Sequence, residues 1–396
     1  MLTRKNNKNG DQLSILGFGC MRFPMKGNNI DETRSIAMIR ESIEQGINYF
    51  DTAYFYHGGK SESLLGDALS GGYRERVKVA TKLPPFMVSN LDGAKKILEK
   101  QLTKLKTNYI DYYLLHMLSD KPTFDRMVKI GVVDWLEQLK KDGTIKNIGF
   151  SFHGAKTDFE QILVAYPWDF CQIQYNYLDE NNQATKSGLQ LAYSLGIPVV
   201  VMEPLRGGKL VNNLPEQVTK EFKNYDEKQT PAEWALRWIW NHPEVTVILS
   251  GMSDEEQMAE NIKIAKTAEA NILSEEELKV FDRVKAIMME KTKVPCTACG
   301  YCMPCPFGVN IPGCFSAYND KYLLGDKHIR LKYIQTLGAI SKQPAYASLC
   351  TECGKCERHC PQNIQIRKEL KTVKKEMEGF LFKPMVGVMR KIMKVI

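Results

Sequence analysis

The chain is poor in cysteine over most of its length. Of its eleven cysteines, only Cys20 and Cys171 occur in the first 290 residues. The sequence also lacks any run of about 18 uncharged apolar residues, and its first residues, MLTRKNNKNGDQ, lack the apolar stretch of a signal peptide. These absences favour a cytoplasmic protein, in which cysteines are more often metal ligands or buried thiols than disulfides.

The positive charge is confined to one end of the sequence. The net charge is +8, but residues 362–396 hold nine Lys or Arg and three Glu, a surplus of six, so residues 1–361 carry only +2. No aromatic residues alternate with basic ones elsewhere, which argues against nucleic-acid binding. The basic tail mixes apolar and charged residues at near-helical spacing, and this favours a helix docked on the barrel. Association with a membrane surface or an acidic partner is the less favoured alternative.

Short apolar runs alternate with amphipathic segments of helical length between residues 14 and 268. The eight predicted strands are 15–19, 47–52, 77–82, 109–116, 145–151, 170–176, 197–203 and 245–251. Eight such repeats predict an α/β fold whose parallel sheet closes into a (β/α)8 TIM barrel. An open, doubly wound sheet is the rival, and it is weakened because no GxGxxG follows any predicted strand.

Capping signatures and one proline suggest where the barrel ends. Ser253 with Glu256 and Ser274 with Glu277 have the spacing of a capping box, and the helix that follows Ser274 is expected to end near residue 291. Pro295 then opens the cysteine-rich region. The expected domains are a barrel over 1–290, a smaller, mainly α-helical cluster domain over 291–366, and a basic tail over 367–396.

Four ionisable residues stand at the predicted carboxyl ends of successive strands, where the loops of a barrel converge. They are Asp51, Tyr56, Lys82 and His116. Taken singly, each is more often a packed and satisfied side chain. Taken together and in this order, they favour a catalytic site.

At these residues the sequence resembles the aldo-keto reductase superfamily, whose tetrad of Asp, Tyr, Lys and His they match. The resemblance covers roughly residues 12–270. The segments that carry it are FDTAYFY, ATK, LLH, IGFS, QIQYN and PLRGG. It implies an NADP- or NAD-dependent oxidoreductase that acts on a small carbonyl or alcohol.

The chemistry of the four residues agrees with that implication. Reduction of a carbonyl by hydride places negative charge on the oxygen, so a proton donor must lie beside it. Tyr56 is the expected donor, and the ammonium of Lys82 would lower its pKa from about 10. Asp51 would keep Lys82 charged and oriented, while His116 would hydrogen-bond the substrate oxygen.

The resemblance also implies where a nicotinamide cofactor binds without a Rossmann motif. The nicotinamide and pyrophosphate contacts would come from Met21, Ser151, Gln174, Met202, Leu205, Arg206 and Gly207. The adenosine end would lie in residues 249–261, at Gly251, Ser253, Gln257 and Asn261. Many members of the family have an arginine where this chain has Gln257, and a basic residue where it has Gly251, so the choice between NADP and NAD stays open.

Two cysteine-rich runs follow the predicted barrel: CTACGYCMPCP at residues 296–306 and CTECGKCERHCP at residues 350–361. The second has the CxxCxxCxxxCP spacing that binds 4Fe-4S clusters in bacterial ferredoxins, and the first is one residue shorter. By this resemblance one cluster would use Cys296, Cys299, Cys302 and Cys360, and the other Cys350, Cys353, Cys356 and Cys305. Two zinc ions are the rival occupants, because CxxC pairs also form tetrahedral sites.

Three functions therefore remain open from sequence. The chain is a carbonyl reductase whose two clusters are structural or sensory, an enzyme that couples a nicotinamide or flavin cofactor to a ferredoxin-like partner, or a non-catalytic binding module that carries clusters. The loops that would shape the substrate, around residues 54–60 and 117–125, do not identify it.

Overall fold

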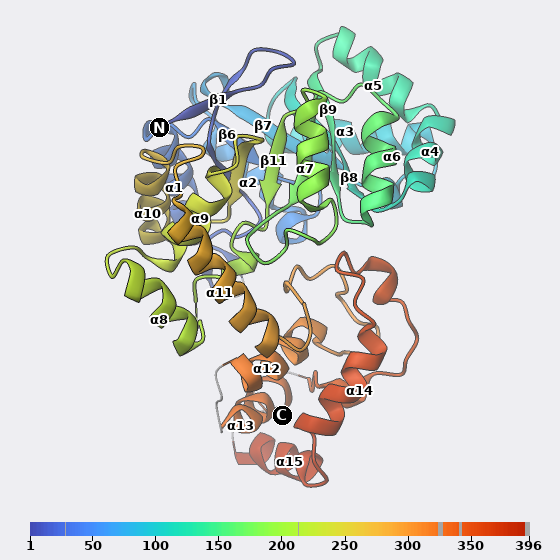
Figure 1. Ribbon diagram of the computed structural model, residues 1–396. Coiled ribbons are helices and arrows are strands. Elements are labelled where there is room, and N and C mark those ends of the chain that lie inside the picture. Colours follow the sequence, from blue (N-terminus) through green and yellow to red (C-terminus); the bar gives the residue numbers. More distant parts are fainter. Residues whose placement is uncertain (28, 213, 324–327, 340–342, 393–396) are drawn as a thin grey trace. The chain divides into compact units, whose positions relative to one another are not determined.

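Eight parallel strands close into a barrel in the N-terminal part of the chain (Figure 1). Around the barrel their order is β10, β11, β12, β3, β6, β7, β8 and β9. Their bounds are β3 (Leu16–Gly19), β6 (Tyr49–Asp51), β7 (Lys78–Leu83), β8 (Ile110–Leu118), β9 (Ile145–Phe152), β10 (Phe170–Gln174), β11 (Val199–Met202) and β12 (Val245–Ser250). The predicted barrel is confirmed, and the open doubly wound sheet is wrong.

The strands are buried along almost their whole length because one face fills the barrel and the other lies under helices. Inside the barrel, large side chains from different strands form one buried cluster, which includes Tyr49, Tyr112 and Phe170. The rings of Tyr112 and Phe170 meet edge to face, with centroids 4.9 Å apart. The barrel is therefore a filled core, and any site must lie at its ends.

This structure, a computed structural model, describes residues 1–27, 29–212, 214–323, 328–339 and 343–392. The chain divides into two compact units. We call Met1–Leu205 with Ala232–Leu273 the barrel unit, and Arg206–Pro231 with Ser274–Ile396 the C-terminal unit. The helix near residue 290 is thus grouped with the C-terminal unit, and the domain boundaries expected from sequence stay a prediction.

The helices of the barrel unit connect its strands. They are α1 (Glu32–Glu44), α2 (Ser61–Ala68), α3 (Leu91–Leu105), α4 (Lys121–Lys129), α5 (Val132–Lys141), α6 (Lys156–Val164), α7 (Thr185–Ser194), α9 (Pro231–Trp240) and α10 (Glu255–Ala265). Asp254, not Ser253, caps α10, because its side chain accepts a hydrogen bond from the Gln257 amide at 2.8 Å. The predicted capping box at Ser253 is therefore wrong by one residue.

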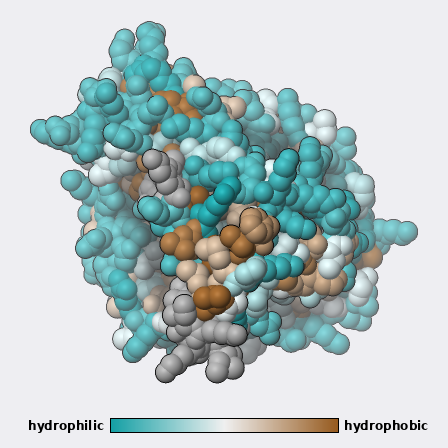
Figure 2. All heavy atoms as spheres, turned by 90° about the horizontal axis from the view of Figure 1, so that it is seen from below, coloured by the Kyte–Doolittle hydropathy of each residue, from teal (hydrophilic) through white to brown (hydrophobic). Residues whose placement is uncertain are grey.

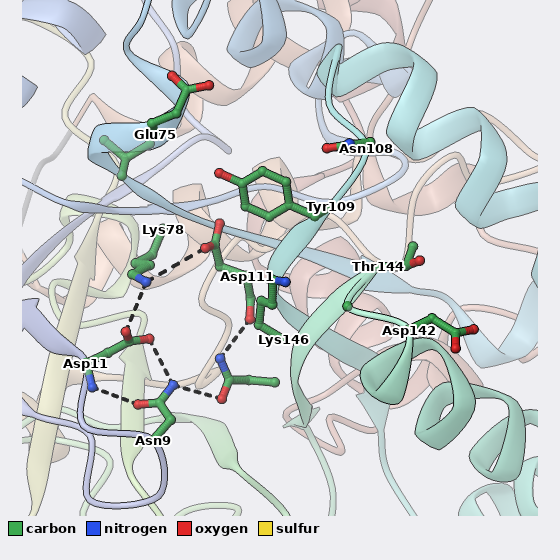
Figure 3. Close-up of a pocket in the computed structure, with 13 residues that line it drawn as sticks. Asn9, Asp11, Glu75, Lys78, Asn108, Tyr109, Asp111, Asp142, Thr144 and Lys146 are labelled. Carbon is green, nitrogen blue, oxygen red and sulfur yellow. Dashed lines mark hydrogen bonds and ion pairs between the residues drawn. The ribbon is translucent and has the colours of Figure 1, made fainter.

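Two short hairpins were not predicted from the sequence. One pairs β1 (Thr3–Lys5) with β2 (Gln12–Ser14), and the other pairs β4 (Met25–Lys26) with β5 (Asn29–Ile30). The β1–β2 turn is tied to the amino-terminal ends of the barrel strands, where Asp11 lies 2.9 Å from the Lys78 ammonium. Figure 3 shows the polar pocket at this end, in which Asn9 also donates to Asn147.

The C-terminal unit is mainly helical. Its helices are α8 (Glu216–Tyr225), α11 (Glu275–Lys291), α12 (Ile311–Leu323), α13 (Ile329–Tyr333), α14 (Ile366–Met377) and α15 (Phe382–Ile392). The capping box predicted at Ser274 is confirmed at the start of α11. The helix α14 buries Ile366, Leu370, Val373 and Met377 in the core of this unit, so the basic tail packs there. Among the described residues, no helix is long and apolar enough to cross a membrane.

Candidate active site and cysteine-rich sites

Three of the four predicted catalytic residues come from neighbouring strands of the barrel. Asp51 ends β6, Lys82 lies near the end of β7, and His116 lies near the end of β8. Tyr56 follows β6 in a 3-10 turn, η1 (Tyr56–Gly59). Because β6, β7 and β8 are adjacent and parallel, their carboxyl ends bring the four side chains to one place.

The ammonium of Lys82 is the centre of this group. Its Nζ lies 2.6 Å from Oδ1 of Asp51, 2.8 Å from the carbonyl oxygen of Thr52 and 3.3 Å from the hydroxyl of Tyr56. Lys82 and Asp51 are both almost fully buried. A phenol, an ammonium and a carboxylate thus form one connected chain in an interior setting.

Burial and pairing act in opposite directions on this ion pair. Burial lowers the pKa of Lys82, and the negative charge of Asp51 opposes that shift. Burial likewise raises the pKa of Asp51, and the charge of Lys82 opposes it. Each ion therefore depends on the other to stay charged, because an isolated charge at this depth would neutralise.

His116 is buried beside Tyr56 and is held by aromatic packing. Its ring stacks on Phe55 with centroids 5.0 Å apart and lies 6.0 Å from the ring of Tyr56. Burial, followed by the charge of Lys82, holds the pKa of His116 well below its usual range. The imidazole is therefore neutral, and its Nδ1 makes no hydrogen bond within the described residues.

A layer of polar residues behind Lys82 was missed by sequence reasoning. Gln101, from α3, donates to the carbonyl oxygen of Lys82 at 3.0 Å and to Glu62 at 2.8 Å. Glu62 also accepts from the hydroxyl of Thr81 at 2.8 Å. These residues fix the backbone that carries the ammonium. Their spacing along the chain gives no signal, since the contacts exist only once α2, α3 and β7 are packed.

Ser151 and Gln174 lie at the carboxyl ends of β9 and β10 and are buried. The Ser151 hydroxyl accepts from the backbone N–H of Met117 at 2.8 Å. Gln174 donates to Asp179 at 2.8 Å and accepts from Gln183 at 2.9 Å. Both side chains are thus held in fixed positions at the barrel end that carries the tetrad.

The remaining expected cofactor residues are less constrained. Met21 follows β3 and Met202 ends β11, and both are half-buried, as is Leu205. Arg206 and Gly207 come next along the chain, in a 3-10 turn, η4 (Arg206–Gly208). These two belong to the C-terminal unit, whereas the other expected cofactor residues belong to the barrel unit.

The expected adenosine end lies at the start of α10 and has an acidic character. Asp254 caps the helix, Glu255 and Glu256 occupy its first turn, and Gln257 donates to the Asp254 carboxylate at 2.6 Å. Ser253 donates to Gln257, and Asn261 donates to Ser250 at 3.0 Å.

At the expected adenosine end, the side chain of Arg22 packs against Gly251. A Cβ atom built on Gly251 would lie 3.1 Å from the side chain of Arg22. The stem of Arg22 therefore packs where the side chain of a larger residue at position 251 would begin.

The cysteines form two groups drawn from both runs. Cys296, Cys299, Cys302 and Cys360 line one cavity together with apolar residues such as Ile311 and Phe315. Burial, aided by the thiols of the other three, raises the pKa of Cys302 to about 12. Within the described residues, no three His, Cys, Asp or Glu side chains converge tightly enough for a single metal ion. The thiols of Cys296, Cys299, Cys302 and Cys360 line this cavity together.

The second group lies around Cys356. Burial raises its pKa to about 11, and the neighbouring thiols that add to the shift are those of Cys350 and Cys305. Cys353 is exposed. The structure thus places Cys360 with the first run and Cys305 with the second, which is the exchange of fourth ligands that the ferredoxin resemblance implies.

The two runs have the same local backbone. Ala298 and Glu352, which precede the second cysteine of each run, have φ of 57° and 61°. Their amides donate to the thiols of Cys296 and Cys350, both at 3.4 Å. Gly300 and Gly354 follow with φ of 82° and 72°. Amides that point at a sulfur stabilise a thiolate, so both runs are shaped as ligand loops.

The buried histidines generate a pH prediction. Burial lowers the pKa of His153 to about 4, whereas the pKa of an unfolded histidine is about 6.5. Below pH 6.5 the unfolded chain therefore binds more protons than the folded one. We expect His153 to reduce the free energy of unfolding by up to about 1.4 kcal/mol per pH unit as the pH falls from about 6.5 towards 4. The pKa of His116 is also lowered by burial, so His116 acts in the same direction.

All five tryptophans lie in the barrel unit, so their fluorescence during urea unfolding measures this slope. The variant His153→Asn should lower the slope by about 1.4 kcal/mol per pH unit. His359→Asn, at an exposed position, is the control and should leave it unchanged. Equal slopes in the wild type and the His153 variant would refute the prediction.

Models of known protein families match both the barrel and the cysteine-rich region. The model of the Aldo/keto reductase family matches residues 15–285, and that of the 4Fe-4S dicluster domain matches residues 295–364. The uncharacterized oxidoreductase YqkF of Bacillus subtilis (strain 168) is 28% identical over 308 residues, which cover 70% of this chain and 95% of its own.

Solved structures match the same part of the chain. The aldo-keto reductase AKR11C1 from Bacillus halodurans, in its holo form, is 27% identical with a TM-score of 0.60 and covers 72% of this chain and 96% of its own. An aldo-keto reductase from Klebsiella pneumoniae in complex with NADPH shares the fold, with 23% identity, a TM-score of 0.58 and coverage of 72% and 96%. The chain belongs to the aldo/keto reductase family and carries a 4Fe-4S dicluster domain after its barrel.

Proposed function

We propose that the barrel transfers hydride between a nicotinamide cofactor and a small carbonyl or alcohol, with Tyr56 as the proton donor. The observation that carries this proposal is the buried ammonium of Lys82, which contacts both Asp51 and the hydroxyl of Tyr56. A connected carboxylate, ammonium and phenol at the carboxyl end of a barrel is suited to acid–base chemistry.

In the reducing direction, negative charge develops on the carbonyl oxygen as it accepts hydride. The Tyr56 hydroxyl donates its proton to that oxygen and becomes a phenolate. The Lys82 ammonium, 3.3 Å away, stabilises the phenolate, and Asp51 keeps Lys82 charged in its buried position. Neutral His116 donates a hydrogen bond to the substrate oxygen and so orients the carbonyl.

When bound, the nicotinamide supplies or accepts the hydride. The fixed polar groups of Ser151 and Gln174 would hold its carboxamide, with Met21 and Met202 along the ring and ribose. Leu205, Arg206 and Gly207 would follow at the pyrophosphate. The adenosine would lie towards Gly251, Ser253, Gln257 and Asn261.

The acidic start of α10 favours NAD over NADP. A helix amino terminus normally attracts a phosphate through its free amides and its dipole. Here the Asp254 carboxylate already accepts the Gln257 amide at 2.8 Å, and of the two glutamates in the first turn Glu255 is paired with Arg34, which leaves the charges of Asp254 and Glu256. The additional phosphate of NADP would meet this negative charge without an arginine at position 257 to pair with it.

The cysteine groups would each hold one 4Fe-4S cluster, giving two clusters in the chain. One would be bound by Cys296, Cys299, Cys302 and Cys360, and the other by Cys350, Cys353, Cys356 and Cys305. The shared backbone of the two runs and the cavity of the first group support this assignment.

The catalytic proposal is tested by Tyr56→Phe. We expect kcat for reduction of a small aldehyde probe such as 4-nitrobenzaldehyde to fall by about 10²- to 10⁴-fold, because the proton donor is lost. The dissociation constant of NADH should change little. Tyr54→Phe, which removes a hydroxyl from the same loop, is the matched control. Full activity in Tyr56→Phe would eliminate Tyr56 as the donor.

The cofactor preference is tested by binding measurements. The wild-type protein should bind NADH about tenfold more tightly than NADPH, and the double variant Asp254→Asn with Gln257→Arg should reverse this order. Asparagine still caps a helix, so the fold of α10 is retained. Glu260→Gln, which removes one charge from the same helix, should leave the order unchanged. Tighter binding of NADPH by the wild type would contradict the assignment.

The exchange of fourth ligands is tested by Cys360→Ser. We expect iron to fall from about eight to about four atoms per chain, with loss of the electron paramagnetic resonance signal of one cluster. Cys305→Ser should remove the other signal. Cys314→Ser is the control, since Cys314 is a buried thiol that hydrogen-bonds Tyr333. Zinc in place of iron after anaerobic purification would support the rival site.

A further inference from the structure

The two cysteine runs share a backbone but differ in charge. Between Val294 and Asn319, which spans the first run, the sequence has no Asp, Glu, Lys or Arg. The second run has two acidic residues, Glu352 and Glu357, and two basic residues, Lys355 and Arg358, within seven positions. The second run therefore carries charged side chains of its own, whereas the charge beside the first run comes from another segment, where Lys209 donates to the Cys296 carbonyl oxygen at 3.0 Å.

The two groups also differ in their access to solvent. Cys353, in the second run, is the one exposed cysteine among the described residues. The first group faces a cavity whose walls include the apolar side chains of Ile311, Phe315 and Ile364. A molecule that approaches from solvent therefore reaches a thiol of the second group more closely than one of the first.

Basic residues of α14 lie against the second run and neutralise its acids. Arg367 pairs with Glu357 at 2.7 Å, and its guanidinium lies 3.6 Å from the position of a Cβ on Gly354. Lys371 pairs with Glu352 at 2.7 Å. These two ion pairs balance both acidic residues of the run. The positive charges of Lys355 and Arg358, which are both exposed, are therefore in excess.

We call four exposed basic residues of the second run and of the α14 side chains paired with it the basic rim. They are Lys355, Arg358, Arg367 and Lys371. Against Glu352 and Glu357, the rim leaves a local surplus of two positive charges. A cleft or ring of one sign accelerates the approach of a molecule of the opposite sign and orients it.

We propose that the second cysteine run is the port at which the cluster domain exchanges single electrons with a small acidic electron-carrier protein. The proposal rests on the proposed function, because it requires a cluster at the second group. In each exchange, one electron leaves the reduced cluster and reduces one carrier by one electron, with no atom transferred. The basic rim binds the carrier, and exposed Cys353 shortens the path of the electron.

A lipid surface is the other partner that a basic face could bind, and the rim does not suit it. Binding to lipid requires apolar side chains that enter the interface. Among the described residues, no large exposed apolar side chain lies between residues 343 and 379. Such side chains occur later, at Phe380, Leu381, Met385 and Val388, and Figure 2 shows apolar side chains gathered among hydrophilic ones on one face.

The test compares two carriers that have the same haem chemistry and opposite charge, an acidic and a basic c-type cytochrome. Dithionite-reduced holoprotein is mixed with each cytochrome, and the rate of cytochrome reduction is measured by stopped flow. We expect the wild type to reduce the acidic cytochrome faster, and this rate to fall as salt is added. The double variant Lys355→Glu with Arg358→Glu should reduce the acidic cytochrome about tenfold more slowly.

The control is Lys220→Glu with Lys223→Glu, two exposed lysines of α8 in the same C-terminal unit. This variant changes the net charge by the same amount as the rim variant. The rate at which it reduces the acidic cytochrome should stay within about twofold of the wild-type rate. Equal slowing in both double variants, or no slowing in either, overturns the proposal. So does sedimentation of the wild type with phosphatidylserine vesicles that the rim variant abolishes, because it would assign the rim to lipid.

Iron analysis of each protein before mixing shows whether the cluster sites are filled, independently of the electron-transfer rate. Intact clusters with rates that ignore the charge of the carrier contradict the electron port alone. Absence of cluster iron contradicts the proposed cluster sites and the port together. The aldehyde assay with Tyr56→Phe tests the barrel independently of both.

Discussion

The buried ion pair between Lys82 and Asp51 is the constraint on which the candidate active site depends. Two charges at this depth are tolerated only because each stabilises the other at 2.6 Å and because the Thr52 carbonyl accepts a further hydrogen bond. The backbone that carries Lys82 is held in turn by Gln101, Glu62 and Thr81. The position of the Tyr56 hydroxyl relative to the ammonium is thus fixed by the packing of the barrel.

The sequence predicted those features that follow from a regular spacing. Eight buried runs separated by helices predict a closed parallel barrel because both faces of every strand must be covered. The proximity of Asp51, Lys82 and His116 could be predicted because the carboxyl ends of neighbouring parallel strands meet at one end of a barrel. The cysteine grouping was predicted because three thiols at intervals of three residues can surround only three corners of a cluster, so the fourth must come from elsewhere.

The features that sequence reasoning missed depend on tertiary contacts or on one-residue shifts. The β1 strand, TRK, is too short and polar to show alternation, and it is stable because its hairpin is tied to Lys78 and Asn147 at the end of the barrel. Asp254 and Ser253 are both good caps, and only the structure shows which side chain accepts the Gln257 amide. The difference matters, since it places a carboxylate at a helix amino terminus, which would otherwise be suited to a phosphate.

The contrast between the cysteine runs shows how one backbone design can serve two environments. The left-handed residues at Ala298 and Glu352, and the amides that point at sulfur, set the shape of both loops. The remaining positions are free to differ, and here the first run has uncharged residues while the second has charged ones. Of the two runs, only the second therefore combines charged side chains of its own with a cysteine exposed to an approaching molecule.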